Sequence, residues 1–403
     1  MGASLSKTAM ARFRRVTESL VYIPEVDGLR FVAIASVFIF HLAGDVIRHS
    51  PPSYKFEHAT EPLFWLTQRL NLGVQLFFVI SGFVLGLPFA QRWLGGGLKP
   101  INLKRYYLRR LTRLEPPYLI ALICFFFLKL AAGRDTAASL FGHLAASCVY
   151  LHNQIYGRPS DINFVSWSLE IEVQFYLLAP LLTFALFRIQ RPKLRWAILL
   201  ASCAGAGVLA LAADNSARLN LSLLGQAPFF LAGLGLADIY VSTKEAPGQR
   251  HRWDLAAAFG AGAVFACLKS QSSWLFLSPI AIAFTYLAAL RGQRVKALLG
   301  APVIATIGGM CYSIYLVHNY VIAIAGNLTE HFTRAAYPFA ERLLVQASVL
   351  APITLVVSAV FFLLIEKPCM RPDWPSRLAL FLRVGPVKNQ QVYSPAQVPA
   401  LME

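Results

Sequence analysis

The chain has 403 residues, of which 57% are hydrophobic and 14% are charged, and its formal net charge is +17. A soluble globular domain carries about 25% charged residues, so this composition excludes an ordinary soluble fold. In membrane proteins, Lys and Arg gather in cytoplasmic loops that face anionic lipid. The positive charge therefore indicates a lipid bilayer as partner, and not nucleic acid.

The apolar residues fall into runs long enough to cross a hydrocarbon core about 30 Å thick. In chain order these runs cover 28–47, 73–91, 116–133, 164–187, 196–213, 219–241, 254–268, 273–290, 308–326 and 343–365. They predict an all-α integral membrane protein of the inner or plasma membrane, a bundle of about ten transmembrane helices. One transmembrane domain is expected at 28–366, between a cytoplasmic segment at 1–27 and a basic, Pro-rich, partly disordered cytoplasmic tail at 367–403.

One further apolar segment, 138–151, is too short to cross and suits a re-entrant or interfacial helix. If it does not cross and the N-terminus is cytoplasmic, the inner segments hold 26 Lys and Arg and the outer segments nine. If it did cross, every later loop would change sides and basic clusters would face outward. The positive-inside rule therefore favours ten spans with both termini in the cytoplasm.

The six cysteines form no CxxC pair and have no His partner at metal-ligand spacing. We interpret them as small packing residues, and we expect neither a disulfide framework nor a metal site.

The first span carries Arg30 and His41, which is unusual because an ionisable group at membrane depth costs at least about 2.5 kcal/mol. Eleven residues are close to three helical turns, roughly 16 Å, so both side chains point to nearly the same face. That face must look into protein or a water-filled cavity. Taken alone, Arg30 could snorkel to the inner interface and His41 could be a packing histidine.

The fourth span begins with a polar cluster: Trp167, Ser168, Glu170, Glu172, Gln174 and Tyr176. Under the ten-span topology Glu172 and Gln174 lie within a few turns of the depth of His41, while Glu170 is closer to the interface and could be solvated. A carboxylate beside a histidine orients it and stabilises its charged form, as a general base requires. The alternative is a buried structural ion pair.

The segment before the third span carries Arg105, Arg110 and Arg113 among seven basic residues at 92–113. If this segment is helical, Arg110 and Arg113 are one turn apart, and two guanidinium groups at that spacing could bind phosphates. The residues alone equally allow a positive-inside anchor.

Three further places carry polar side chains. Ser81-Gly82 in the second span is by itself typical of close helix packing. The ninth span holds Tyr315 and His318, and Glu366-Lys367 closes the tenth span, where a charged pair could be only an anchor.

Six segments in this order resemble the acyltransferase-3 family of membrane acyltransferases. They are Asp27-Gly28-Leu29-Arg30 with His41, Phe77 to Phe83, Arg110-Leu111-Thr112-Arg113 with Pro116-Pro117-Tyr118, Trp167-Ser168-Leu169 with Glu172, Tyr312 to Leu316 with His318, and Glu366-Lys367-Pro368. The resemblance covers roughly 24–370. It departs from the family pattern at Val173, where a second acid often follows the first.

The resemblance implies an O-acyltransferase that moves an acyl group, usually acetyl, from acyl-coenzyme A to a hydroxyl of a carbohydrate or glycolipid acceptor. It implies His41 as general base with Glu172 orienting it, and Arg30, Arg105, Arg110 and Arg113 as the donor-binding set. Support for substrate or transition state would come from Ser81, Trp167, Gln174, Tyr176, Tyr315 and His318. The acceptor and the oligomeric state are not specified by the sequence.

Two other classes of protein fit a ten-span bundle with buried charges. A secondary transporter or flippase for a glycan or lipid-linked sugar should show internal repeats and broken helices in corresponding halves, and no sequence repeat is found. A non-catalytic receptor or scaffold would function without its buried ionisable groups.

Overall fold

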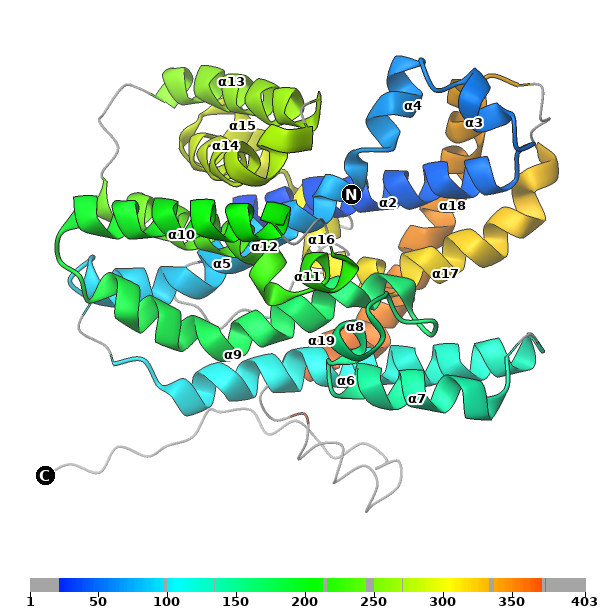
Figure 1. Ribbon diagram of the computed structural model, residues 1–403, viewed down its shortest axis with the longest axis horizontal. Helices are drawn as coiled ribbons and strands as arrows, with labels where there is room; N and C mark the ends of the chain where they lie inside the picture. The colour runs from blue at the N-terminus through cyan, green and yellow to red at the C-terminus, as the bar shows by residue number, and fades with distance from the viewer. Residues whose placement is uncertain are drawn as a thin grey trace, which may run out of the picture.

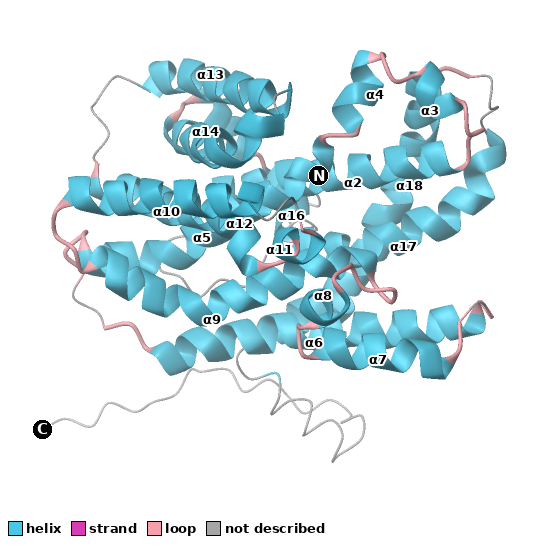
Figure 2. Cartoon of the chain, viewed as in Figure 1, coloured by secondary structure: helices cyan, strands magenta, loops and turns pink. Residues whose placement is uncertain are grey.

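In the computed structural model of the chain, the residues described are 22–97, 100–133, 135–212, 216–243, 250–269, 271–332, 337–371 and 374. Within these ranges every regular element is a helix, and Figure 2 shows the helices joined mostly by short loops. This confirms the predicted all-helical class. Nearly all of the predicted terminal segments, 1–21 at one end and 375–403 at the other, lie outside the described residues.

The helices carry the labels of Figure 1. Their bounds are α2 (Pro24–Arg48), α3 (Tyr54–Glu57), α4 (Pro62–Thr67), α5 (Gly73–Trp93), α6 (Leu103–Ala131), α7 (Ala137–Cys148), α8 (His152–Tyr156), α9 (Trp167–Phe187), α10 (Pro192–Ala212), α11 (Ala217–Asn220), α12 (Leu223–Ser242), α13 (Arg250–Lys269), α14 (Gln271–Arg291), α15 (Arg294–Leu299), α16 (Pro302–Gly309), α17 (Cys311–Thr329), α18 (Phe339–Phe361) and α19 (Lys367–Cys369). In Figure 1, α2, α6, α9, α10 and α12 run roughly parallel to one another.

Six helical segments in the described ranges are long and apolar enough to cross a membrane. They are Pro24–Arg48, Pro62–Trp93, Leu103–Ala131, Phe164–Phe187, Ala217–Ser242 and Phe339–Cys369, and each contains or overlaps a predicted span. A seventh would be the pair α16 and α17, which bends by 70° between its two helices. The chain is therefore an integral membrane protein with at least six candidate spans.

The remaining predicted spans also fall on helices, namely α10, α13 and α14. These three do not meet the same criteria of length and composition over the described residues. The count of ten and the cytoplasmic position of both termini therefore stay predictions. The short segment expected at 138–151 coincides with α7, an apolar helix of 12 residues.

The basic segment before the third span is helical from Leu103 on, which meets the condition for Arg110 and Arg113 to lie one turn apart. Helix α6 begins at Leu103, and Asn102 caps it by accepting a hydrogen bond from the backbone N–H of Arg105 at 2.9 Å. Capping of this kind satisfies one of the free N–H groups at a helix start. Five of the seven basic residues, Lys104, Arg105, Arg109, Arg110 and Arg113, therefore lie on the first turns of a 29-residue helix, which fixes their spacing.

Glycines set the closest approach between α5 and α12. A Cβ atom added to Gly82 would lie 2.2 Å from the carbonyl oxygen of Phe230, and one added to Gly233 would lie 2.3 Å from the carbonyl oxygen of Val79. Small residues at such crossings let two backbones touch, as is common between membrane helices. This contact holds α5 in place, and α5 carries Ser81.

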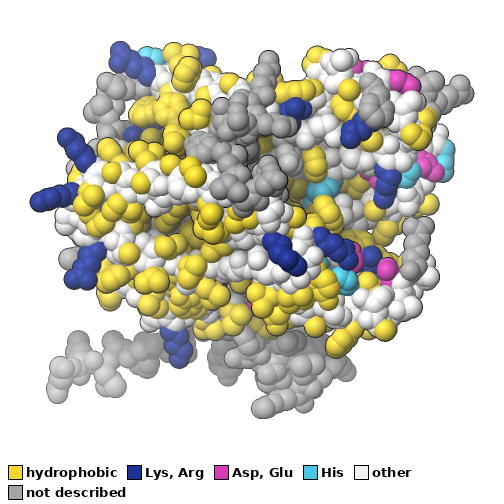
Figure 3. Space-filling view, in the orientation of Figure 1, with side chains coloured by type: hydrophobic (Ala, Val, Ile, Leu, Met, Phe, Trp, Pro, Cys, Tyr) yellow, Lys and Arg dark blue, Asp and Glu magenta, His cyan; other side chains and the backbone are white. Residues whose placement is uncertain are grey.

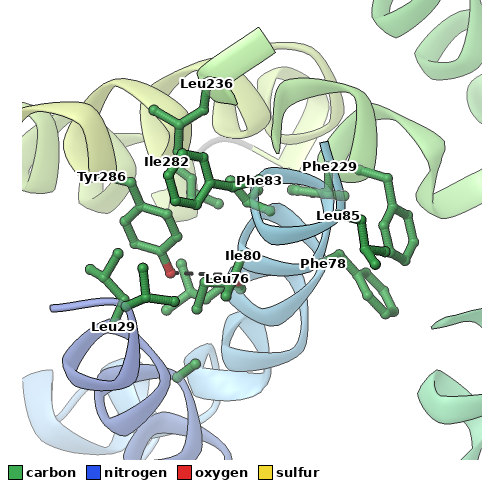
Figure 4. Packing of buried hydrophobic residues seen from close by; sticks show 14 of the residues in the cluster. Leu29, Leu76, Phe78, Ile80, Phe83, Leu85, Phe229, Leu236, Ile282 and Tyr286 are labelled. Atoms are coloured by element: carbon green, nitrogen blue, oxygen red, sulfur yellow. Dashed lines mark hydrogen bonds between the residues drawn. The ribbon is translucent and has the colours of Figure 1, made fainter. Parts of the chain in front are cut away.

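The main hydrophobic core fills the space between α2, α5, α12 and α14. Figure 4 shows Leu29 of α2, Phe83 of α5, Leu236 of α12 and Ile282 of α14 converging there. The hydroxyl of Tyr286 donates a hydrogen bond to the carbonyl oxygen of Leu76 at 3.4 Å, drawn as a dashed line. This packing fixes the position of α2 relative to α5.

The outer surface is strongly apolar. Phe127, Leu181 and Phe259 are 62%, 66% and 74% exposed, respectively. Hydrophobic side chains cover much of the face in Figure 3, and several Lys and Arg side chains stand along its left edge. A large apolar surface of this kind is unfavourable in water and suits contact with lipid.

Candidate active site

A cavity of about 1010 Å³ lies between α2, α5, α6, α9 and α17. Eight of the twelve side chains that the sequence singled out line it, from five different helices. They are Arg30, Ser81, Arg105, Arg110, Arg113, Glu172, Tyr176 and Tyr315. The other four, His41, Trp167, Gln174 and His318, lie outside the lining.

The first turns of α6 supply a cluster of positive charge to the cavity. Arg110 and Arg113 are one helical turn apart, and both line it. The guanidinium of Arg110 lies 3.8 Å from the ring centre of Tyr106 and donates a hydrogen bond to the Tyr106 carbonyl oxygen at 3.1 Å. Stacking on an aromatic ring holds the planar guanidinium in a defined orientation, which favours recognition of carboxylate or phosphate.

Arg113 lies close to Glu366, the residue directly before α19. Its Nη2 atom lies 3.9 Å from a carboxylate oxygen of Glu366, whose side chain is fully buried. Glu366 also accepts hydrogen bonds from the backbone N–H and the hydroxyl of Ser313, at 3.1 and 2.5 Å. Glu366 is therefore more than an interfacial anchor, because it ties α17 to α6 beside the cavity.

Arg30 faces the cavity from α2. Its Nη1 atom donates to Oδ1 of Asp27 at 2.5 Å, one turn earlier on the same helix. The other oxygen of Asp27 accepts from the hydroxyl of Tyr22 at 2.9 Å. The ion pair offsets the cost of placing Arg30 at membrane depth and holds its guanidinium against the cavity wall.

Glu172 joins two helices in the middle of the cavity wall. Its Oε1 atom accepts hydrogen bonds from the hydroxyl of Ser81 on α5 and from the hydroxyl of Tyr176, one turn later on α9. A carboxylate accepts such bonds best in its charged form. The arrangement fixes three polar side chains around one point of the cavity.

Towards its far end the cavity meets Ser168 and Tyr315, whose hydroxyl oxygens are 2.6 Å apart. The Tyr315 hydroxyl also donates to the carbonyl oxygen of Val165 at 2.5 Å. The Tyr315 ring lies edge-on to Phe77, at 6.2 Å between ring centres. The sequence analysis gave Ser168 no role of its own, and its place opposite Tyr315 could not be derived from spacing.

His41 and His318 lie together just beyond Tyr315. Their ring centres are 5.1 Å apart, and the ring of His318 is 5.8 Å from that of Tyr315. His318 is fully buried, whereas His41 is partly exposed and also packs edge-on against Phe164 at 6.2 Å. The cavity lining thus includes Tyr315 but neither histidine, and His318 contacts the rings of both Tyr315 and His41.

The expected contact between Glu172 and His41 is not observed in the part of the chain that the structure describes. Glu172 bonds to Ser81 and Tyr176, and the ring neighbours of His41 are Phe40, Phe164 and His318. The physical reason is lateral packing: α9 packs mainly against α5 and α12, while α2 packs against α5, α16 and α17. Similar depth in the membrane therefore did not bring the two side chains together.

Three residues of α9 contact α8 or the nearby Tyr150, and none of them lines the cavity. Gln174 donates to the carbonyl oxygen of Tyr150 at 3.2 Å, and the carbonyl oxygen of Trp167 accepts from Asn153 at 2.7 Å. Glu170, for which the sequence allowed solvation, is fully buried and accepts the backbone N–H of Asn153 at 3.0 Å. Their contacts are those of residues that hold α8 against α9.

Among the described residues no group of three or more His, Cys, Asp or Glu side chains has the geometry of a metal site. All six cysteines are free.

The fold and the cavity define a polytopic membrane protein with an arginine-lined chamber, whose wall includes Tyr315, and the ring of Tyr315 contacts His318, the neighbour of His41. The chain belongs to the acyltransferase-3 family, since the family model described as an acyltransferase domain matches residues 23–365. This confirms the resemblance drawn from the six motifs.

Curated relatives cover part of the chain. A protein of Staphylococcus aureus (strain COL) named "Putative O-acetyltransferase SACOL0978" is 30% identical over 171 residues, which are 40% of this chain and 24% of the relative. The peptidoglycan O-acetyltransferase OatA of Listeria monocytogenes is 27% identical over 193 residues, 45% of this chain and 27% of the relative. The O-acetyltransferase OatA of Staphylococcus aureus (strain NCTC 8325 / PS 47) is 29% identical over 227 residues, 51% of this chain and 34% of the relative.

The matched regions thus span between about a quarter and a third of the length of these relatives. No solved structure matches the chain.

Proposed function

We propose that this protein transfers an acyl group, in the first instance acetyl, from acyl-coenzyme A to a hydroxyl of a carbohydrate or glycolipid acceptor in the cell envelope. The observation that carries the proposal is the cavity itself, which is lined by the arginines of α6, by Glu172 and by Tyr315, whose ring contacts His318 and through it His41. Membership of an acyltransferase family, and relatives named O-acetyltransferases, support the same reaction type.

In this proposal the arginines of the cavity form the binding site for acyl-coenzyme A. Coenzyme A carries several phosphate charges, and a guanidinium binds phosphate through two parallel hydrogen bonds. Arg105, Arg110 and Arg113 would hold these phosphates at the start of α6, and Arg30 would contact the donor deeper in the cavity. Under the predicted topology this end of the cavity is cytoplasmic, where acyl-coenzyme A is made.

His41 would act as general base. It would remove the proton of the acceptor hydroxyl as that oxygen attacks the thioester carbonyl carbon. The tetrahedral intermediate then collapses, the carbon–sulfur bond breaks, and the thiolate of coenzyme A takes up the proton. Glu172 has a different role in this scheme from the one expected, because it orients Ser81 and Tyr176 along the acyl path and does not orient His41.

Hydroxyl groups near the far end would support the transition state. Ser168 and Tyr315 lie where the acyl group would arrive. The Tyr315 hydroxyl donates to Val165 and the Ser168 hydroxyl then donates to Tyr315, so either would stabilise an oxyanion only after turning to it. The Ser81 hydroxyl is engaged with Glu172, so it stabilises an oxyanion only after it turns away from that carboxylate. Trp167 and Gln174 act indirectly in this proposal, by fixing the start of α9.

A transporter remains the alternative class. A transporter with inverted repeats carries broken helices in corresponding halves. Across the described ranges, α16 with α17 is the one bent pair that could form a broken span, and no counterpart accompanies it in the first half. This observation favours the enzyme.

The test is a transfer assay with the purified full chain, radiolabelled acetyl-coenzyme A and a crude cell-envelope glycan extract. We expect label to appear in the glycan and free coenzyme A to form in equal amount. Glycan movement across proteoliposomes without consumption of acetyl-coenzyme A would instead support a transporter.

A further inference from the structure

The geometry of His318 specifies which of its ring nitrogens carries the hydrogen. The Nδ1 atom lies 3.0 Å from the carbonyl oxygen of Ile314 and 2.8 Å from that of Tyr315. Carbonyl oxygens can only accept hydrogen bonds, so Nδ1 must be the donor. In a neutral imidazole the other nitrogen, Nε2, then carries a lone pair and can only accept.

This Nε2 atom is buried and has no hydrogen-bond partner among the residues that the structure describes. The whole side chain is fully buried, and an unsatisfied acceptor in such a place is costly. The ring of His41 contacts that of His318 at 5.1 Å between ring centres and 58° between ring planes, closer than the ring of Tyr315 at 5.8 Å. The two rings are not hydrogen-bonded as they stand in the structure. The His143 and His152 rings, with centres 5.0 Å apart, do share a hydrogen bond of 2.8 Å between ring nitrogens, so a turn of the His41 ring would bring such a bond within reach.

We propose that His318 is a positioning residue for His41: its Nε2 atom accepts an N–H of the His41 ring and so selects the tautomer of His41. The second nitrogen of His41 is then unprotonated and free to receive the acceptor's proton. This inference rests on the proposed function. It assigns to His318 the orienting role that the sequence interpretation gave to Glu172.

His41 is partly exposed, whereas His318 is fully buried, so only His41 is accessible to the acceptor. The acceptor meets His41 on its exposed side, and His318 contacts His41 from the buried side, next to Tyr315. When His41 takes up the acceptor's proton, its bond to His318 becomes charge-assisted and therefore stronger. The proton leaves His41 for the thiolate of coenzyme A, and His318 neither gains nor loses a proton in the cycle.

Two substitutions separate this role from simple packing. In His318→Asn the amide N–H₂ lies near the position of Nδ1, so the bonds to the carbonyl oxygens of Ile314 and Tyr315 are kept while the acceptor at Nε2 is lost. In His318→Gln the longer side chain can place its carbonyl oxygen near the position of Nε2. His331→Asn serves as control, because His331 is exposed and lies in the short 3₁₀ segment Glu330–Phe332.

The experiment measures kcat and KM for acetyl-coenzyme A with the full-length proteins and the glycan extract. We expect His318→Asn to lower kcat at least about tenfold with KM unchanged, and His318→Gln to recover part of that loss. Combining His318→Asn with His41→Ala should cost no more than His41→Ala alone, because His318 acts through His41.

A kcat of His318→Asn equal to that of His331→Asn, with an active wild type, would overturn the role of His318 and leave the proposed function intact. Equal losses in the Asn and Gln variants, or losses additive with His41→Ala, would likewise overturn it. Absence of acetyl transfer by the wild type would overturn both proposals.

Discussion

Ser81 of α5 donates a hydrogen bond to Glu172 of α9 across the wall of the cavity. Both helices are held by α12, which contacts α5 closely at Gly82 and packs against α9. The carboxylate therefore sits at a junction that neither helix could build alone. Hydrogen bonds to a charged group are worth about 1.5–3 kcal/mol each. Loss of the bonds to Glu172 should therefore displace the Ser81 and Tyr176 side chains that line the cavity.

The first prediction concerns that junction. Glu172→Gln keeps the size of the side chain but weakens the acceptor shared by Ser81 and Tyr176, so kcat for acetyl transfer should fall roughly tenfold or more. A double-mutant cycle between Ser81→Ala and Glu172→Gln should show coupling. The exposed Glu57→Gln is the control, and additive effects in the cycle would argue against the junction.

The second prediction concerns donor binding. Arg110→Lys keeps the charge but loses the planar group stacked on Tyr106, so affinity for coenzyme A should fall about tenfold. Calorimetric titration of the purified protein with coenzyme A measures this. Arg188→Lys is the matched control, because Arg188 lies outside the cavity lining and stacks on Phe184 at 5.6 Å. Unchanged affinity in Arg110→Lys would leave Arg110 a topological anchor.

The third prediction concerns Glu366. Its carboxylate is fully buried and accepts two hydrogen bonds from Ser313. Glu366→Gln replaces this acceptor by a neutral amide, which should lower the free energy of unfolding by about 1–3 kcal/mol and reduce the thermal midpoint in detergent. The exposed Glu341→Gln should leave the midpoint unchanged. Equal midpoints for the two variants would show that Glu366 is only an anchor.

The helices themselves could be predicted from the sequence, and the lateral contacts could not. The apolar runs correctly located α2, α5, α9, α12 and α18, because about 20 consecutive apolar residues match the thickness of the hydrocarbon core. The start of α6 was missed, since its first turns are charged and carry no apolar signal. The bend of 70° between α16 and α17 could not be predicted from hydropathy, because apolar residues continue across the break and no Pro lies at it.

In the candidate site, too, positions along a helix could be predicted, whereas contacts between helices could not. Helical periodicity placed Arg30 and His41 on nearly one face of α2, and the structure puts Arg30 on the cavity and His41 beside His318. Depth along the membrane suggested Glu172 as the partner of His41. Depth carries no information on which helix lies next to which, so the partner of His41 could be found only from the packing of α2 against α17.

The fourth prediction concerns pH and a cluster outside the spans. His152 of α8 accepts the Nδ1–H of His143 at 2.8 Å and donates to the carbonyl oxygen of Arg158 at 3.1 Å. Burial, with a smaller effect of His143, lowers the pKa of His152 from 6.5 to about 4. Tyr156 stacks on its ring, and Arg158 and Asp161 form an ion pair beside it.

Because the folded protein resists protonation of His152, its contribution to stability is complete above about pH 6.5 and is lost as the pH falls towards about 4. The thermal midpoint of the wild type should fall over this window. His152→Gln removes the titrating group and should flatten the fall, whereas the exposed His331→Gln should not. Parallel pH curves for wild type and His152→Gln would contradict this assignment.

The central claim is that His41 performs the chemistry at the end of a cavity that binds the donor. The measurement that tests it most directly compares wild type and His41→Ala for both transfer of labelled acetyl to glycan and affinity for coenzyme A. We predict that His41→Ala loses transfer by a factor of about 10² to 10⁴ while its affinity for coenzyme A stays that of the wild type. Full transfer by a normally folded His41→Ala protein would contradict the account.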